Sequence, residues 1–279
     1  MSTEGSGRVY FVGAGPGDPE LLTLKAHALL RSADLVLHDD LVPPAIVSLA
    51  GPRAMSVNVG KRCGVKRITQ PEINRLMIAS ARRGESVVRL KSGDPGIFGR
   101  LAEELDALEA AEVAFEIVPG VTAGIGAAAA LGVSLTDRRK SSRLVIVSGH
   151  HASEKQPEPP TDWAGLARED TTLVIYMPGR DLAKISRELL RAGLPAATPS
   201  VVVSRATTPD QHEIVTTLGE LGTVAGVKAP SILLIGRALE HAGAKASSSG
   251  SRELRLLVEG VTQEISAASR NNSERNIAP

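Results

Sequence analysis

The feature that most constrains the fold is a regular alternation of short apolar runs with helical patterns in the first half of the 279-residue chain. Residues 18–33 carry an apolar stripe at helical spacing, with Asp18 as the expected N-cap, and residues 69–84 open with Thr69 and Glu72 at the spacing of a capping box. Strands that alternate with helices pair in parallel, because each helix returns the chain to the same edge of the sheet. The alternation therefore predicts an α/β fold. The expected strands are RVYFV (8–12), DLVL (34–37), MSVNV (55–59), SVVRL (86–90) and FEIV (115–118).

A second series of apolar runs begins near Arg143, with a helix expected over residues 181–191. We place a domain boundary at TDRRKSS (136–142), which gives two α/β domains, 8–138 and 143–242. The serine-rich spacer that follows predicts a flexible tail over 243–279. The expected strands of the second domain are RLVIVS (143–148), TTLVIY (171–176), SVVVS (200–204), HEIVTTL (212–218) and SILLIG (231–236).

The composition argues against several classes of function. A formal net charge of +1 and an aromatic content of 2% supply neither a basic surface nor stacking rings for nucleic acid. No apolar run reaches the length of a membrane span and the first ten residues do not resemble a signal peptide, so we expect a cytoplasmic protein with no membrane partner. Cys63 is the only cysteine, and the histidines are scattered except for His150 and His151. We therefore expect neither a disulfide nor a metal site.

The stretch FVGAGPGDPELLTL (11–24) reads as a strand, a glycine-rich turn and a helix, which is how many nucleotide-binding sites begin. Gly13 and Gly15 fit the Gly-x-Gly-x-x-Gly fingerprint of dinucleotide-binding folds, but Gly17 comes one residue too early. Asp39, at the end of the next strand, has the place of the acid that binds a ribose in those folds. A nicotinamide-dependent oxidoreductase therefore stays open as an alternative.

Unusual loops follow all five expected strands of the first domain. Ligands of open parallel sheets bind beyond the carboxyl ends of the strands, so these loops are expected to converge on one site. Glycine lets backbone amides and carbonyls approach a ligand closely, which suits a small polar molecule recognised through the main chain. The loops are GAGPGD (13–18), HDDLV (38–42), GKRCG (60–64), KSGDPGIFG (91–99) and PGVTAG (119–124).

These loops and their flanking segments resemble the S-adenosylmethionine-dependent tetrapyrrole methylases, and within that family the uroporphyrinogen-III branch in particular. The resemblance covers about residues 8–240, and its motifs occur in the family's order. They are VGAGPGDPELLTLKA (12–26), ADLVLHDDLV (33–42), VGKR (59–62), QPEIN (70–74), VVRLKSGDPGIFGR (87–100), IVPGVTAGIGAAAALGVSLTDR (117–138), SGH (148–150) and YMPG (176–179).

The resemblance implies the transfer of two methyl groups to uroporphyrinogen III, at carbons 2 and 7, which yields precorrin-2 and two molecules of S-adenosylhomocysteine. Precorrin-2 leads to cobalamin or siroheme. The resemblance also implies a homodimer in which the cofactor, S-adenosylmethionine, lies in a cleft between two α/β domains and contacts backbone groups of several loops.

Carried over residue by residue, the resemblance makes Asp39 the proton acceptor and Lys61 the proton donor. Asp39 has the alternative role of a helix cap, Lys61 that of a solvated surface lysine, and Thr122 that of a cap for the helix that follows it. The expected cofactor contacts are Pro16, Ser92, Gly93, Asp94, Ile97, Thr122, Ala123, Met177 and Ala206.

A substrate with eight carboxylates calls for local basic residues, because the chain as a whole is nearly neutral. The candidates in or beside the loops are Lys61, Arg62, Lys66, Arg67, Lys91 and Arg100.

The chain departs from the family pattern at a few positions. Ser92 stands where the family has glycine in its Gly-Gly-Asp-Pro loop, Asp137 replaces a histidine, His38 a tyrosine and Ala206 a glycine. A later precorrin as substrate is therefore an alternative. A non-catalytic tetrapyrrole-binding protein is another, although the presence of both Asp39 and Lys61 argues against it.

Overall fold

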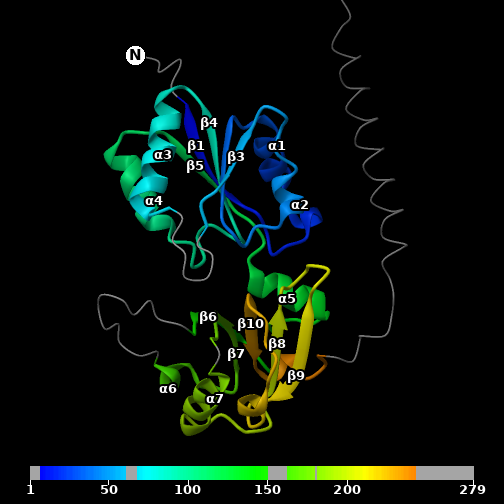
Figure 1. Cartoon of the computed structure of the whole chain (residues 1–279). Helices are drawn as coiled ribbons and strands as arrows, with labels where there is room; N and C mark the ends of the chain where they lie inside the picture. The colour runs from blue at the N-terminus through cyan, green and yellow to red at the C-terminus, as the bar shows by residue number, and fades with distance from the viewer. Residues whose placement is uncertain (1–6, 61–67, 150–161, 180, 243–279) are drawn as a thin grey trace, which may run out of the picture. The chain divides into compact units, whose positions relative to one another are not determined.

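The computed structural model describes residues 7–60, 68–149, 162–179 and 181–242, which contain two five-stranded sheets (Figure 1). The first sheet is parallel throughout, in the order β3-β2-β4-β1-β5. All its carboxyl ends therefore lie on one edge. Its strands are β1 Arg8–Gly13, β2 Leu35–His38, β3 Met55–Asn58, β4 Ser86–Lys91 and β5 Phe115–Val118.

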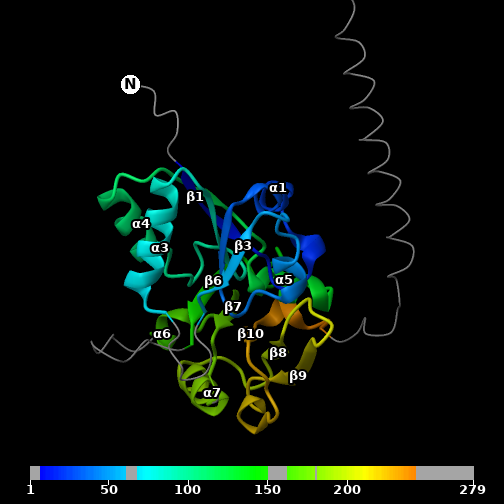
Figure 2. The same ribbon diagram turned by 45° about the horizontal axis from the view of Figure 1, so that its top comes forward.

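Helices cover both faces of the first sheet, because its strands are apolar on both sides (Figure 2). In β1, Val9 and Phe11 face the side covered by α3 (Gln70–Arg82) and α4 (Leu101–Ala110). Val12 faces the opposite side, which α1 (Leu24–Ser32) and α2 (Pro44–Val47) cover.

The second sheet is mixed, in the order β6-β7-β10-β8-β9. β6 runs parallel to β7, whereas β10 is antiparallel to both β7 and β8, and β9 is antiparallel to β8. Its strands are β6 Arg143–Ser148, β7 Thr171–Tyr176, β8 Pro199–Ser204, β9 His212–Thr217 and β10 Ser231–Ile235.

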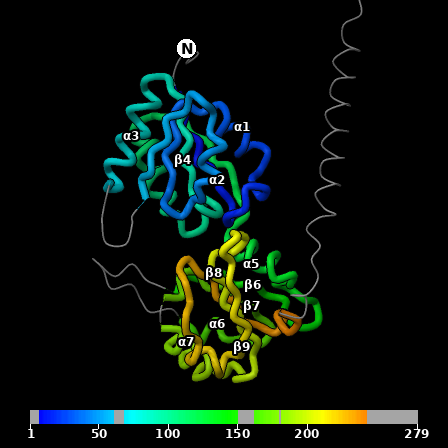
Figure 3. The backbone as a smooth tube through the Cα atoms, turned by 45° about the vertical axis from the view of Figure 1, so that its right-hand side comes forward, coloured from blue at the N-terminus to red at the C-terminus, as the bar shows by residue number. Residues whose placement is uncertain are grey.

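One face of the second sheet is packed by α5 (Ala123–Leu131), the helix that follows the last strand of the first sheet (Figure 3). Ala127, Ala128 and Leu131 of α5 share a core with Val174 and Leu234. The other face is packed by α7 (Leu182–Arg191), with α6 (Trp163–Leu166) and the 3-10 turn Leu221–Thr223 beside it. A last 3-10 turn, Arg237–Leu239, follows β10.

All ten expected strands are present to within one residue at each end. The capping box is confirmed: Thr69 caps α3, and the carboxylate of Glu72 accepts a hydrogen bond from the Thr69 amide. The helix expected over residues 181–191 is present as α7, and Asp181 is its N-cap.

The prediction of a single helix over residues 18–33 is wrong at the start of that range. Asp18 caps only the 3-10 turn Pro19–Leu21, by accepting from the amide of Glu20 at 2.9 Å. Leu22 is extended, and Thr23 then caps α1 by accepting from the amide of Ala26 at 3.1 Å. The segment holds two capping side chains five residues apart, and each starts its own helical turn.

Among the helices of the described segments, none combines the length and the apolar character needed to cross a bilayer.

Candidate active site

The loops after β1, β4 and β5 pack backbone against backbone at the carboxyl edge of the first sheet. Gly15 and Gly93 exchange two hydrogen bonds, at 3.1 Å and 2.8 Å between nitrogen and oxygen. A Cβ on Gly120 would lie 2.4 Å from the carbonyl oxygen of Gly93 and 2.9 Å from the Cα of Gly13. Gly13 and Gly120 are therefore needed for close contact between the loops. The sequence analysis had expected the glycines of these loops to allow close approach of a ligand.

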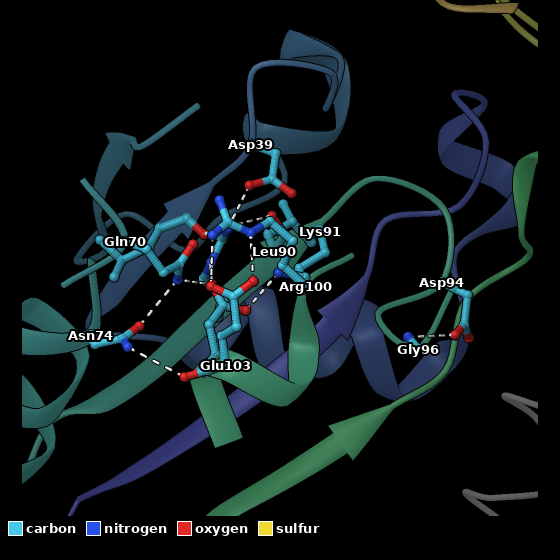
Figure 4. A network of polar contacts seen from close by, with 12 residues as sticks. Asp39, Gln70, Asn74, Leu90, Lys91, Asp94, Gly96, Arg100 and Glu103 are labelled. Carbon is cyan, nitrogen blue, oxygen red and sulfur yellow. Dashed lines mark hydrogen bonds and ion pairs between the residues drawn. The ribbon is translucent and has the colours of Figure 1, made fainter. Parts of the chain in front are cut away.

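Asp94 fastens the loop after β4 to the loop after β5. Its Oδ1 accepts from the amide of Gly96 at 2.8 Å (Figure 4). Its Oδ2 accepts from the amide of Gly120 at 3.0 Å. Both carboxylate oxygens are thus held by backbone. A ligand near Asp94 would therefore contact a loop held in place by this carboxylate, because neither carboxylate oxygen is free of hydrogen bonds.

The N-terminus of α5 is capped by a side chain from the second sheet. The hydroxyl of Tyr176, the last residue of β7, accepts from the amide of Gly124 at 2.7 Å and lies 2.6 Å from the hydroxyl of Thr122. Thr122 occupies the N-cap position but makes no capping hydrogen bond with its own side chain. The ring of Phe98, from the loop after β4, lies 5.2 Å from the ring of Tyr176 between centroids. Residues from both sheets therefore meet at this point.

The loop after β8 contacts the glycine-rich turn. The hydroxyl of Thr207 accepts from the amide of Asp18 at 3.1 Å. Pro16 lies against α5, where a Cβ on Gly126 would be 2.7 Å from the Pro16 ring. Ala206 is buried in the core under α5. These contacts bring Pro16 and Ala206 to the same region as Thr122.

Several residues around this region have a left-handed backbone that side chains with a Cβ rarely adopt. Met177 has a φ of 49°, Arg205 of 49°, Thr207 of 64° and Phe98 of 51°. Each such residue costs about 1–3 kcal/mol, and such strain clusters at functional sites. The strain lies at the ends of β7 and β8 and in the loop after β4, where the expected cofactor contacts are.

Asp39 lies at the same edge, next to the end of β4. Its amide donates to the carbonyl of Leu90 at 3.2 Å, two residues before Ser92. Its side chain does not cap α2, whose N-cap is Pro43. Instead its Oδ1 accepts from Arg89 at 2.5 Å, and its carboxylate is 31% exposed. Within the described segments Oδ2 accepts no hydrogen bond, so one oxygen is anchored and the other is open.

Arg89 links Asp39 to a buried network of charged side chains (Figure 4). Its Nε donates to Glu104 at 2.8 Å, and Lys91 donates to the other oxygen of Glu104 at 2.6 Å. The side chains of Arg89, Lys91 and Glu104 are at most 4% exposed. Gln70 also donates to Glu104, at 3.2 Å.

Burial alone would lower the pKa of Arg89, but the charges of Asp39 and Glu104 outweigh it and raise that pKa. Burial lowers the pKa of Lys91, and the neighbouring charge of Arg89 lowers it further against the pull of Glu104 and Asp39.

The basic residues expected to bind substrate carboxylates differ in their exposure, and four of them lie outside the described residues. Lys91 is buried on Glu104, so its ammonium does not face a ligand. Arg100 is half-exposed at the start of α4 and pairs with Glu103 at 2.6 Å. The others, Lys61, Arg62, Lys66 and Arg67, lie outside the described residues.

The remaining expected contacts surround the meeting point of the loops. Ser92 and Gly93 lead the loop after β4, and Ile97 and Ala123 pack at the edge of the core under α5. The region is lined by small residues, with the exposed apolar side chains of Met177 and Phe98 at its margin. This combination fits an adenosyl group, which needs room, an apolar surface for its base and backbone groups for its polar atoms.

Two features of this region were missed from the sequence. Arg89 interrupts the apolar run SVVRL at a position buried inside the sheet, and a charge at such a position is a signal of a buried partner. The partner, Glu104, gives no such signal, because it lies in the ordinary helical pattern of α4. Tyr176 precedes the methionine of YMPG and gave no sign of its contact with α5.

Comparison with known proteins adds four findings, three from sequence and one from structure. Residues 8–222 match the family model described as Tetrapyrrole (Corrin/Porphyrin) Methylases. The chain is 48% identical over 234 residues to the uroporphyrinogen-III C-methyltransferase of Pseudomonas aeruginosa, a match that covers 83% of this chain and 94% of that protein. It is 45% identical over 237 residues to the siroheme synthase of Hahella chejuensis, again over 83% of this chain, but it spans only 49% of that longer protein.

Among solved structures, the fold is similar to the uroporphyrin-III C-methyl transferase from Thermus thermophilus in complex with S-adenosylhomocysteine, with a TM-score of 0.71 and 40% identity. That match covers 84% of this chain and 99% of the other.

Proposed function

Because the chain belongs to the tetrapyrrole methylase family, we propose that it transfers two methyl groups from S-adenosylmethionine to carbons 2 and 7 of uroporphyrinogen III. The products are precorrin-2 and two molecules of S-adenosylhomocysteine. The identity of 48% to a uroporphyrinogen-III C-methyltransferase supports this substrate.

The observation that carries the proposal is the position of Asp39 beside the convergent loops. Its amide is bonded to Leu90, directly before the loop that contains Ser92 and Gly93. A carboxylate with one open oxygen therefore lies at the edge where the small-residue loops meet. This arrangement suits a reaction in which a macrocycle is held beside a cofactor and loses a proton.

S-adenosylmethionine supplies a methyl group that is already activated by the positive sulfur. The protein must chiefly hold a nucleophilic carbon in line with that methyl group, and such positioning contributes up to about 7–11 kcal/mol. The loops fastened by Asp94 and by the hydroxyl of Tyr176 provide the required rigidity. We assign the cofactor contacts to Pro16, Ser92, Gly93, Asp94, Ile97, Thr122, Ala123, Met177 and Ala206.

Asp39 accepts the proton that leaves the macrocycle when a ring carbon has been methylated. A general base must come within hydrogen-bond reach of the proton, and the proposal is supported by Oδ2 of Asp39, which accepts no hydrogen bond from the described residues. Lys61 is proposed as the proton donor on the resemblance alone, since it lies outside the described residues. Arg100 is the described basic residue that we propose for a substrate carboxylate.

The finer features of the family are part of the same proposal. They are a homodimer, a cytoplasmic location, and a division into domains 8–138 and 143–242 with the cofactor cleft between them and a tail over 243–279. The product feeds siroheme or cobalamin synthesis.

The alternative substrate is a later precorrin. It is favoured only by the departures from the family pattern, of which Ser92 and Ala206 lie among the proposed cofactor contacts. A nicotinamide-dependent oxidoreductase is the more distant alternative, and the early third glycine at Gly17 argues against it.

Calorimetric titration of the purified protein with S-adenosylhomocysteine and, separately, with NAD⁺ tests the cofactor. Saturable binding of S-adenosylhomocysteine alone is expected, and binding of NAD⁺ alone would contradict the proposal. Transfer of label from methyl-labelled S-adenosylmethionine to a tetrapyrrole, followed under anaerobic conditions, tests for turnover. A protein that binds S-adenosylmethionine and the tetrapyrrole without methyl transfer would be a binding protein and not an enzyme.

A further inference from the structure

The candidate proton acceptor, Asp39, belongs to a group of four charged side chains that lie together. They form a continuous line of contacts from Asp39 through Arg89 and Glu104 to Lys91. Two are cations and two are anions, so the line is electrically balanced. Asp39 is 31% exposed, whereas Glu104 at the centre is fully buried, so the line runs from the interior to one carboxylate at the surface.

Stability does not explain why such a network is present. Taking charges out of water costs several kcal/mol for each ion, and apolar replacements of similar volume are often neutral or stabilising. The sheet around Arg89 is apolar on both sides, with Val87, Val88 and Leu90 in the same strand. A hydrophobic residue at position 89 would continue that pattern, so the arginine points to a functional requirement.

The contacts leave the guanidinium of Arg89 almost no freedom. Nε donates to Glu104, one terminal nitrogen donates to Asp39, and the other donates to the carbonyls of Leu37 and Leu90 at 3.3 Å each. Leu37 belongs to β2, two residues before Asp39. Arg89 is therefore tied both to the carboxylate and to the strand that carries it.

Glu104 is fixed in turn by three donors. Arg89 and Gln70 donate to Oε1 at 2.8 Å and 3.2 Å, and Lys91 donates to Oε2 at 2.6 Å. Gln70 is itself bonded to Asn74, which donates to the backbone of α4 (Figure 4). The orientation of Arg89 is thus set by α3 and α4, the two helices on one face of the sheet.

We propose that Arg89, held in place by Glu104, is a positioning residue that fixes the carboxylate of Asp39 in the orientation required to accept the substrate proton. Lys91 completes the network by neutralising the second oxygen of Glu104. This inference rests on the proposed function, because it assigns Arg89 a role in the proton transfer of that reaction.

The test is a double-mutant cycle on methyl transfer, with the variants Arg89→Lys, Asp39→Asn and both together. Lysine keeps the charge at position 89 but cannot reach Asp39, Glu104 and Leu37 at once, because it lacks the planar fork of arginine. We expect Arg89→Lys to lower kcat at least tenfold, with the KM for S-adenosylmethionine and the binding of S-adenosylhomocysteine changed less than twofold. In the Asp39→Asn background the same substitution is expected to lower kcat less than twofold further, because Arg89 acts through Asp39.

The matched control is Arg83→Lys. Arg83 is an exposed arginine that pairs with Glu85 at 2.8 Å at the end of α3, away from the network, and its replacement is expected to leave kcat and KM unchanged. If Arg89→Lys does not bind S-adenosylhomocysteine or shows no cooperative unfolding, Glu104→Gln replaces it in the cycle. That variant keeps the shape of the side chain and removes the charge that orients Arg89.

Two results would overturn the inference alone: undiminished kcat in Arg89→Lys or Glu104→Gln, or an equal fold-loss in the presence and absence of the Asp39 carboxylate. The second result would mean that the network supports the fold generally. Failure of the wild-type protein to methylate uroporphyrinogen III would overturn the proposed function and the inference with it.

Discussion

The hydroxyl oxygen of Tyr176, at the end of a strand in the second sheet, lies 2.7 Å from the amide nitrogen of Gly124, in the first turn of the helix that follows the first sheet. The same hydroxyl lies 2.6 Å from that of Thr122. A single side chain thus satisfies a backbone donor at the start of α5 and holds a proposed cofactor contact. The geometry of a loop that we propose to contact the cofactor therefore depends on a residue more than fifty positions later in the chain.

Replacing this tyrosine by phenylalanine removes only the hydroxyl. We expect Tyr176→Phe to lower the free energy of unfolding by about 1–2 kcal/mol, because the Gly124 amide loses its acceptor. Affinity for S-adenosylhomocysteine is expected to fall roughly threefold to tenfold, since Thr122 and Ala123 lose their anchor, a loss of about 1 kcal/mol. Chemical denaturation and calorimetric titration measure the two effects.

The chain provides its own control, because Tyr10 is the only other tyrosine. Its hydroxyl makes no hydrogen bond to any residue that the structure describes, so Tyr10→Phe is expected to change neither quantity. Equal effects of the two substitutions would show that the cap on α5 is not important for binding.

Asp94 is expected to support the site through the backbone. In Asp94→Asn one of the two amides, that of Gly96 or that of Gly120, would face an NH₂ group in place of an oxygen. We expect a loss of about 1–3 kcal/mol in unfolding free energy together with weaker binding of S-adenosylhomocysteine, since one of the two hydrogen bonds that hold the loops after β4 and β5 is lost.

Asp162→Asn is the control for this substitution. Asp162 caps α6 by accepting from the amide of Gly165 at 3.1 Å, and asparagine caps helices about as well as aspartate. This variant is expected to keep both stability and affinity. An Asp94→Asn protein that bound S-adenosylhomocysteine as tightly as the wild type would contradict the role given to Asp94.

The strands and the α3 cap were predictable because their signals are local. The run RVYFV forms β1 by apolar character alone, and Thr69 with Glu72 marks the start of α3 through contacts three residues apart. The apolar pattern did not give the extent of α5, because its small residues, from Ala123 to Leu131, form no amphipathic stripe; the only sign of this helix was Thr122 as a possible cap.

The interactions that support the site residues were not predictable, because the partners are distant in sequence. Nothing near Arg89 indicates that its partners are Asp39, from another strand, and Glu104, from a helix. The position of Lys91 in a loop motif made it a candidate for binding a substrate carboxylate, whereas the structure shows it buried and paired with Glu104 of α4. Resemblance to a family supplies the expected contacts, but it does not supply these supporting interactions.

Asp137, where the family has a histidine, gives the protein a specific acid sensitivity. Hydrogen bonds from Arg139 lower the pKa of Asp137 to about 2. Since this value lies below that of an unfolded aspartate, about 3.9, the carboxylate stabilises the fold above pH ~4, and this contribution is lost as the pH falls toward 2. Removing the carboxylate by Asp137→Asn removes that dependence.

Urea unfolding of the wild type and of Asp137→Asn between pH 2 and 7 measures this pH-dependent contribution to the unfolding free energy. The difference in unfolding free energy between the two proteins is expected to be constant above about pH 5 and to shrink at lower pH. A difference that stays constant, or grows, toward pH 2 would show that the Arg139 contact does not persist in solution.

Asp39→Asn tests the proton acceptor itself. Asparagine keeps the size of the side chain but cannot accept the proton, so kcat is expected to fall by about 10²–10⁴-fold while S-adenosylhomocysteine still binds. Asp106→Asn, an exposed aspartate on α4, is the control and is expected to leave turnover unchanged. Undiminished turnover in Asp39→Asn with intact cofactor binding would assign the base elsewhere.

The central claim is that this chain methylates uroporphyrinogen III twice. Its most direct test is anaerobic incubation of the purified protein with uroporphyrinogen III and methyl-labelled S-adenosylmethionine, followed by mass spectrometry of the tetrapyrrole product. Two labelled methyl groups on each macrocycle, with two S-adenosylhomocysteine molecules released, is the expected result. An unchanged macrocycle in the presence of bound cofactor would contradict the claim and direct the search to a later precorrin.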